Sequence, residues 1–164
     1  MSRAFVKEDS PDDPVVLPDK PISSLKNYVT PEGYSWIQSR VEELQQKLHS
    51  LVQNDDQNDG MANKNRRAEL SRDLRYFRNR AESAEIIEVK DTSRVRFGHR
   101  VELTDENDQT YLFHIVGEDE ADVSKNKICW ASPLAMALIG KTTGETCFWK
   151  KSDIQLEIEI TSIQ

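Results

Sequence analysis

The chain has 164 residues, of which 37% are apolar and 31% are charged, a content typical of a globular protein rather than a disordered one. The net charge of −7 argues against wholesale binding of duplex DNA, because nonspecific affinity for DNA comes from cationic side chains that neutralise phosphates. No apolar run approaches the ~18 residues that a membrane span needs, and no secretory signal is evident, so we expect a cytoplasmic protein without membrane contact.

The first predicted segment, residues 1–27, is an extended arm. Pro11, Pro14, Pro18 and Pro21 lie among charged residues, which disfavours both a helix and a core in this part of the chain. The length then leaves room for one compact domain with an appendage.

Two apolar ladders predict an antiparallel coiled coil over residues 28–86. In both ladders the spacing alternates between four and three residues, which is the seam of a coiled coil. When the ladder residues are paired from the outside inward, the two residue numbers of every pair have nearly the same sum, as antiparallel pairing requires. The ladders consist of Ile37, Val41, Leu44, Leu48 and Leu51, and of Leu70, Leu74, Phe77, Ala81 and Ala84.

The start of the first helix is marked by Thr30 as N-cap, Pro31 at the first helical position and Glu32 near the positive end of the helix dipole. We expect this helix to end near Val52 and the second to begin near Ala62. The turn between them is acidic, with Asp55, Asp56 and Asp59, although Asn, Asp and Gly are also ordinary turn residues.

The second helix is basic over residues 64–80, where Lys and Arg outnumber the acidic Glu69 and Asp73. Such a surface attracts RNA phosphates through charge rather than by reading bases. A solvated helix face with ion pairs inside the helix explains the same pattern. The candidate RNA-contacting residues are Arg66, Arg67, Arg72, Arg75 and Arg78.

Beyond Glu85 the apolar period changes from helical to alternating, which predicts half-buried strands. A short helix follows, with Ser132 as its cap, Pro133 at its first position and Gly140 at its stop. One helix against a small, mostly antiparallel sheet makes residues 87–164 an α+β domain. The alternating residues are Val101 and Leu103, then Tyr111, Phe113 and Ile115, then Leu156, Ile158 and Ile160.

Several residues that often carry chemistry are interpreted as structural. Cys129 and Cys147 lie in strand-like runs without zinc or redox spacing and are expected to be buried thiols. His114 has no second metal-type residue at a useful spacing, so we expect it to be exposed or hydrogen-bonded in the sheet. We expect three tryptophans to pack rather than to stack on bases: Trp36, Trp130 and Trp149.

Residues 84–89, 97–98, 115–122 and 132–141 resemble, in order and spacing, the bacterial transcript cleavage factors of the GreA/GreB family. The resemblance covers roughly residues 28–164. It implies an N-terminal antiparallel coiled coil followed by an FKBP-like domain.

The resemblance also implies a function. Family members dock at the rim of the RNA polymerase secondary channel and insert the coiled coil, whose acidic end helps to hold Mg²⁺ and water while the polymerase hydrolyses backtracked RNA. Here Asp55, Asp56 and Asp59 would act on the polymerase-bound metal, and Ser132 and Pro133 would dock. The expected partners are RNA polymerase and the nascent RNA 3′ end, with weak DNA or RNA contact; no tightly bound cofactor and no catalysis by the protein alone are expected.

The chain departs from the family pattern at three places. The family has an Asp followed three residues later by a Glu, whereas Asp56 and Asp59 keep the spacing but end in Asp. Ala131 stands where the family places a polar or acidic residue. The hairpin is shorter by about ten residues, which at about 1.5 Å per helical residue withdraws its end by about 8 Å.

Other functions therefore stay open. The protein either seats deeper in the channel, or occupies it as a non-cleaving regulator. An FKBP-like fold also suggests prolyl isomerase activity as an alternative. The sequence signals no aromatic-lined pocket, however, and fold alone does not establish function. A coiled-coil adaptor would bind proteins without any effect on transcription.

Overall fold

The computed structural model describes residues 16–53 and 60–164, and the chain divides into two compact units. The expected boundaries were residues 27 and 86. The division differs from them because the first part of α1 and the last residues of α2 belong to the same unit as the sheet. The first unit comprises the described residues up to Ser23 and Arg40–Asn79, and the second comprises Ser24–Ser39 and Arg80–Gln164.

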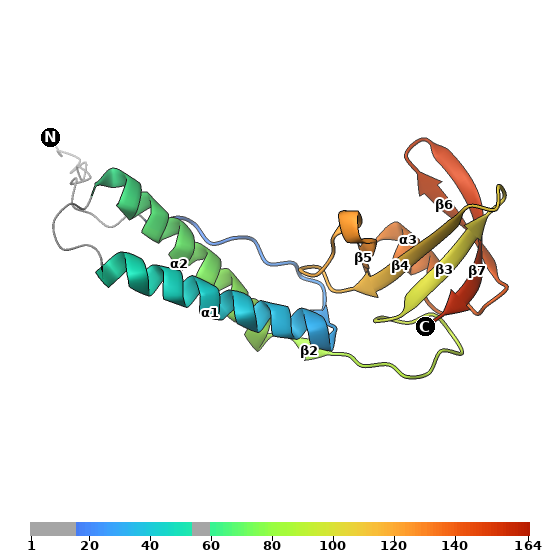
Figure 1. Cartoon of the computed structure of the whole chain (residues 1–164), viewed down its shortest axis with the longest axis horizontal. Helices are drawn as coiled ribbons and strands as arrows, with labels where there is room; N and C mark the ends of the chain where they lie inside the picture. Colours follow the sequence, from blue (N-terminus) through green and yellow to red (C-terminus); the bar gives the residue numbers. More distant parts are fainter. Residues whose placement is uncertain (1–15, 54–59) are drawn as a thin grey trace, which may run out of the picture. The chain divides into compact units, whose positions relative to one another are not determined.

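Two long helices, α1 (Pro31–Gln53) and α2 (Met61–Glu82), lie side by side in Figure 1 and form the hairpin. Their bounds agree within about two residues with the expected ones, the usual uncertainty of a helix end. The amide of Gly33 donates to Thr30 Oγ1 at 2.9 Å, which confirms Thr30 as the N-cap. None of the described helices is long and apolar enough to cross a membrane.

The first unit has a thin apolar core between α1 and α2. Leu44, Leu70 and Leu74 are buried, and partly buried apolar side chains pack against them. These positions belong to the two ladders, so the predicted seam is confirmed in this part of the hairpin. The partly buried neighbours are Val41, Leu48, Leu51 and Phe77.

In the second unit, two short strands form the base of the hairpin. β1 (Tyr28–Val29) pairs in parallel with β2 (Glu85–Ile86), so that the residues before α1 and after α2 lie in register. The amide of Glu85 donates to the carbonyl of Asn27 at 2.9 Å. Sequence reasoning missed this pair, because two-residue strands are too short to show a periodicity.

The main sheet has five strands in the order β5-β4-β3-β7-β6. Its neighbours are antiparallel except β4 and β5, which are parallel, so the expectation of a mostly antiparallel sheet is confirmed and the sheet is mixed at its β5 edge. One short helix, α3 (Pro133–Leu138), packs against β6, which confirms the α+β class. The other elements are β3 (Arg100–Asp105), β4 (Thr110–Val116), η1 (Val123–Lys125), β5 (Lys127–Cys129), β6 (Thr146–Lys151) and β7 (Ile154–Ile163).

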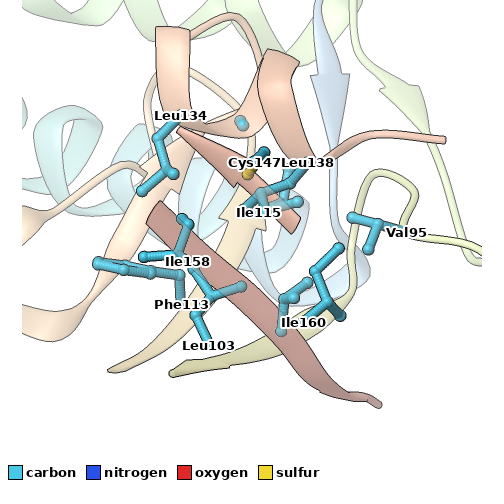
Figure 2. Packing of buried hydrophobic residues seen from close by; sticks show 11 residues of the cluster. Val95, Leu103, Phe113, Ile115, Leu134, Leu138, Cys147, Ile158 and Ile160 are labelled. Atoms are coloured by element: carbon cyan, nitrogen blue, oxygen red, sulfur yellow. The ribbon is translucent and has the colours of Figure 1, made fainter. Parts of the chain in front are cut away.

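The sheet and α3 share the larger apolar core. Figure 2 shows Leu134 and Leu138 of α3 together with Ile115 and Ile158 of the sheet. The alternating residues of β3, β4 and β7 point into this cluster, as their period predicted. Cys147 is buried among them, and burial raises the pKa of its thiol, whereas Cys129 is only half-buried.

Candidate functional site

The acidic turn of the hairpin, with Asp55, Asp56 and Asp59, lies outside the described residues. The described chain stops at Gln53 and resumes at Gly60. Within residues 16–53 and 60–164, no group of three or more His, Cys, Asp or Glu side chains could hold a metal ion. The role of the three aspartates therefore stays a prediction.

The candidate RNA-contacting arginines all lie on α2, but they differ in exposure. Arg66 and Arg78 are exposed, and Arg66 forms a loose ion pair of 3.6 Å with Glu69 one turn away. Arg67 is half-buried, and so is Arg72, whose Nε lies 3.3 Å from Asp73. The sequence predicted one basic surface. In the structure only some of these arginines are exposed, and Arg67 and Arg72 are half-buried.

Arg75, the fifth of these arginines, is bound by the N-terminal arm. Its Nε donates to Asp19 Oδ1 at 2.7 Å, and its Nη2 donates to the carbonyl oxygen of Leu17 at 3.2 Å. Figure 1 shows the blue segment that begins at Val16 beside α2. The sequence contained no signal for this contact, because the partners are 56 and 58 residues apart and the arm has no period.

Arg80, which the sequence counted with the basic residues of α2, is not on the exposed surface. Its side chain is only 2% exposed; Nε donates to Asp119 Oδ2 at 2.5 Å, and Nη2 lies 3.5 Å from Glu118 Oε2. Its carbonyl oxygen accepts from Asn27 Nδ2 at 2.7 Å. A buried cation needs such paired partners, so Arg80 fastens the hairpin base instead of contributing to an RNA surface.

Glu120 forms a second polar connection at the hairpin base. Its Oε2 accepts from the Thr30 hydroxyl at 2.6 Å, and its Oε1 lies 3.0 Å from Lys127 Nζ. Thr30 thus caps α1 through its oxygen and donates its proton to the segment that follows β4. The sequence gives no sign of this role for residues 118–120, whose acidic side chains hold the start of α1 and the end of α2.

The candidate docking residues Ser132 and Pro133 open α3. The amide of Ala135 donates to Ser132 Oγ at 3.3 Å, which confirms the capping role, and Pro133 is exposed. Met136, one turn into the helix, is 66% exposed. This end of α3 therefore offers an accessible, largely apolar surface, and its use in docking stays a prediction.

His114 and the tryptophans have mainly structural surroundings. His114 is half-buried, its Nε2 lies 3.2 Å from the carbonyl oxygen of Gly98, and burial lowers the pKa of its ring. Trp149 packs edge-on against Phe113, and Trp130 packs against Tyr28. Trp36 is 47% exposed, so about half of its surface is covered.

Comparison with known proteins gives one family. The family model described as "Transcription elongation factor, GreA/GreB, C-term" matches residues 90–164. Transcription elongation factor GreB of Neisseria meningitidis serogroup B is 33% identical over 156 residues, which cover 87% of this chain and 96% of that relative. Transcription elongation factor GreA of Pseudomonas syringae pv. tomato is 38% identical over 95 residues, which cover 56% of this chain and 60% of that one.

Two solved structures are also similar. GreA factor homolog 1 (Gfh1) of Thermus thermophilus aligns over 84% of this chain and 97% of its own, with 23% identity and a TM-score of 0.41. The elongation factor GreA/GreB from Nitrosomonas europaea aligns over 83% of this chain and 97% of its own, with 21% identity and a TM-score of 0.41.

Proposed function

Because this chain belongs to the GreA/GreB family of transcription elongation factors, we propose that it binds RNA polymerase at the secondary channel and promotes cleavage of backtracked RNA. The observation that carries the proposal is the match to GreB of Neisseria meningitidis, which extends over both the helical and the sheet parts of this chain. The start of α3, with the half-buried Ser132 and the exposed Pro133, is the proposed docking surface.

The hairpin supplies the reach for this function. Its helices have 23 and 22 residues, so each is about 34 Å long at about 1.5 Å per residue. Asp55, Asp56 and Asp59 lie in the segment that joins Gln53 to Gly60, and the chain itself therefore carries them at the ends of these helices. Two paired helices whose connecting segment is rich in Asp suit delivery of carboxylate ligands into a narrow channel.

The proposed chemistry belongs to the polymerase. Carboxylate oxygens are the ligands that Mg²⁺ prefers, so the three aspartates fit a role as additional ligands or as groups that orient the attacking water. Mg²⁺ at the polymerase centre supplies charge neutralisation and activation of that water. A few carboxylates without such a centre bind Mg²⁺ weakly, and we expect no nuclease activity from the protein alone.

The test is a stalled, backtracked RNA polymerase complex with labelled RNA, incubated with Mg²⁺ and the protein. Short 3′ fragments are expected with wild type and are expected to disappear with Asp56→Ala combined with Asp59→Ala. Glu106→Ala combined with Asp153→Ala removes the same charge from exposed turns of the sheet domain and is the matched control. If the protein binds the complex and no fragments form with wild type, the cleavage function is wrong.

A second candidate function is occupation of the channel without cleavage. It is favoured by Asp59, where the family pattern has Glu, and by the shorter hairpin. A non-cleaving regulator would compete with a cleaving factor for the polymerase, and the double aspartate variant would compete as well as wild type. Competition that disappears with the aspartates would contradict it.

A further inference from the structure

The N-terminal arm occupies the hydrogen-bonding edge of Arg75. Arg offers two parallel N–H groups along the side formed by Nε and one Nη atom, and this fork is what binds phosphate or carboxylate in a bidentate manner. Here both donors are used within the chain, because Nε donates to Asp19 Oδ1 at 2.7 Å and Nη2 donates to the Leu17 carbonyl at 3.2 Å. A phosphate group that binds this edge of Arg75 in a bidentate manner would need the same two donors.

A second contact holds the same stretch of the arm on α2. Lys20 Nζ lies 2.9 Å from Asp73 Oδ1 and 5.8 Å from the centre of the Tyr76 ring. Partial burial tends to raise the pKa of Asp73, but the hydrogen bonds and charges of Lys20 and Arg72 outweigh it, so the pKa lies below its ordinary value. Asp73 is thus charged at neutral pH and can hold the Lys20 ammonium.

The arm is also stiff where it makes these contacts. Pro18 and Pro21 flank Asp19 and Lys20, and proline fixes the backbone φ angle, which reduces the conformational entropy lost when the arm is held. The ion pairs themselves are weak. Asp19 is 74% and Arg75 46% exposed, so water and salt compete for both partners. The contact is therefore one that a stronger ligand can displace.

We propose that residues 16–23 are an internal competitor for nucleic acid, with Asp19 occupying on Arg75 the place of a phosphate of single-stranded RNA. The partner chemistry follows from the fork and from Arg78, an exposed cation about one turn further along α2, and two such cations suit a phosphodiester backbone. Strand binding and arm binding at this edge of Arg75 exclude each other. The proposal deepens the proposed function by regulating its RNA-contacting surface, but it concerns RNA binding by the free protein.

The experiment measures the affinity of the full-length protein for a fluorescein-labelled uridine oligonucleotide by fluorescence anisotropy. Asp19→Asn removes the negative charge that holds the Arg75 fork and is expected to tighten binding about two- to five-fold, the range that follows from the strength of exposed ion pairs. Glu106→Gln removes the same charge from the β3–β4 turn and is the matched control, with little expected change. Because no polymerase is present, the result is independent of whether the protein promotes cleavage.

Two further measurements separate competition from a general charge effect. In an Arg75→Gln background, the gain from Asp19→Asn is expected to vanish. The plot of log affinity against log salt is expected to become steeper by about 0.7 in Asp19→Asn, the value for one additional phosphate contact on a single strand. A circular dichroism spectrum checks that each variant keeps its helices.

The outcomes decide the proposal. It is overturned if Asp19→Asn binds no more tightly than Glu106→Gln, if the gain persists without Arg75, or if neither wild type nor Asp19→Asn binds the oligonucleotide. It is supported if the gain requires Arg75 and the salt slope steepens.

Discussion

At the scale of single residues, Arg80 is the side chain with the strongest predicted effect on stability. It is 2% exposed and paired with Asp119, whose side chain is 10% exposed. Arg80→Ala removes the cation that lies against Asp119 and Glu118, and we expect the free energy of unfolding to fall by about 3–5 kcal/mol. Arg78→Ala, at an exposed position of the same helix, is the control and should change it by less than about 0.5 kcal/mol. Urea denaturation measures both, and equal losses would contradict the role given to Arg80.

Asp105 predicts a pH dependence of stability. It is the last residue of β3, next to the turn into β4, and accepts from the amides of Asn107 at 2.9 Å and Gln109 at 3.0 Å, and from the Tyr111 hydroxyl at 3.1 Å. Desolvation raises the pKa of Asp105, but these hydrogen bonds outweigh it and hold the pKa below its ordinary value. The stabilisation is therefore complete above the ordinary aspartate pKa of about 4 and is lost as the pH falls through the lower, folded-state pKa.

The check is urea unfolding of Asp105→Asn at a series of pH values. Wild type should be more stable near neutral pH, and the difference should shrink as the pH falls below about 4. Asp108→Asn, at an exposed position of the same turn, should keep the pH dependence of wild type. A difference between wild type and Asp105→Asn that is the same at every pH would contradict the assignment.

At the scale of elements, the approach of β4 to β1 depends on Gly117. A Cβ atom at Gly117 would lie 2.3 Å from the backbone oxygen of Tyr28. Because backbone cannot move aside without shifting its strand, Gly117→Ala should cost about 1–3 kcal/mol of unfolding free energy. Thermal unfolding measures the loss.

Gly33→Ala is an informative comparison, because a Cβ there also meets an atom at 2.3 Å, but that atom is Glu120 Oε2 at the end of a flexible side chain. Gly33 lies in the first turn of α1, where Ala favours the helix over Gly by about 1 kcal/mol. We therefore expect a smaller loss than at Gly117. Equal losses would mean that Glu120 cannot move and that its bond to Thr30 is as rigid as the backbone.

The sequence predicted the elements whose signal is repeated along the chain. The ladders on α1 and α2 and the alternation on β3, β4 and β7 each rest on several residues, so a single exception does not hide the pattern. The sequence could not predict features that depend on a single contact between residues far apart in the chain. Arg80 and Arg75 look alike in the sequence, yet one is buried against Asp119 and the other is exposed beside Asp19. The parallel pairing of β1 with β2 also depends on a few contacts between residues far apart in the chain, and the sequence did not predict it.

At the scale of the whole molecule, the two compact units differ in their cores. The buried cluster described between α1 and α2 consists of Leu44, Leu70 and Leu74, whereas the cluster of the sheet unit contains eleven buried residues. A thinner core opens at lower free energy, so we expect the first unit to unfold more readily.

Leu74→Ala tests this difference. Removing a buried Leu side chain typically costs 2–5 kcal/mol, and the loss should fall mainly on the first unit. All three tryptophans lie in the second unit, so their fluorescence reports on it alone, while helical circular dichroism reports on both. The variant should lose helical signal at lower urea than wild type and keep its fluorescence transition. Transitions that shift together would mean that the units unfold as one.

The hairpin can be lengthened or shortened without changing its junction with the second unit. This follows from the pairing of Tyr28 with Glu85 and of Val29 with Ile86. Its two ends are held side by side by β1 and β2, so helical residues can be added or removed between them while the junction is kept. Seven residues added to each helix preserve the coiled-coil period and lengthen the rod by about 10 Å. A series of hairpins of graded length would test the proposed entry into the polymerase channel, because stimulated RNA cleavage should then depend on hairpin length.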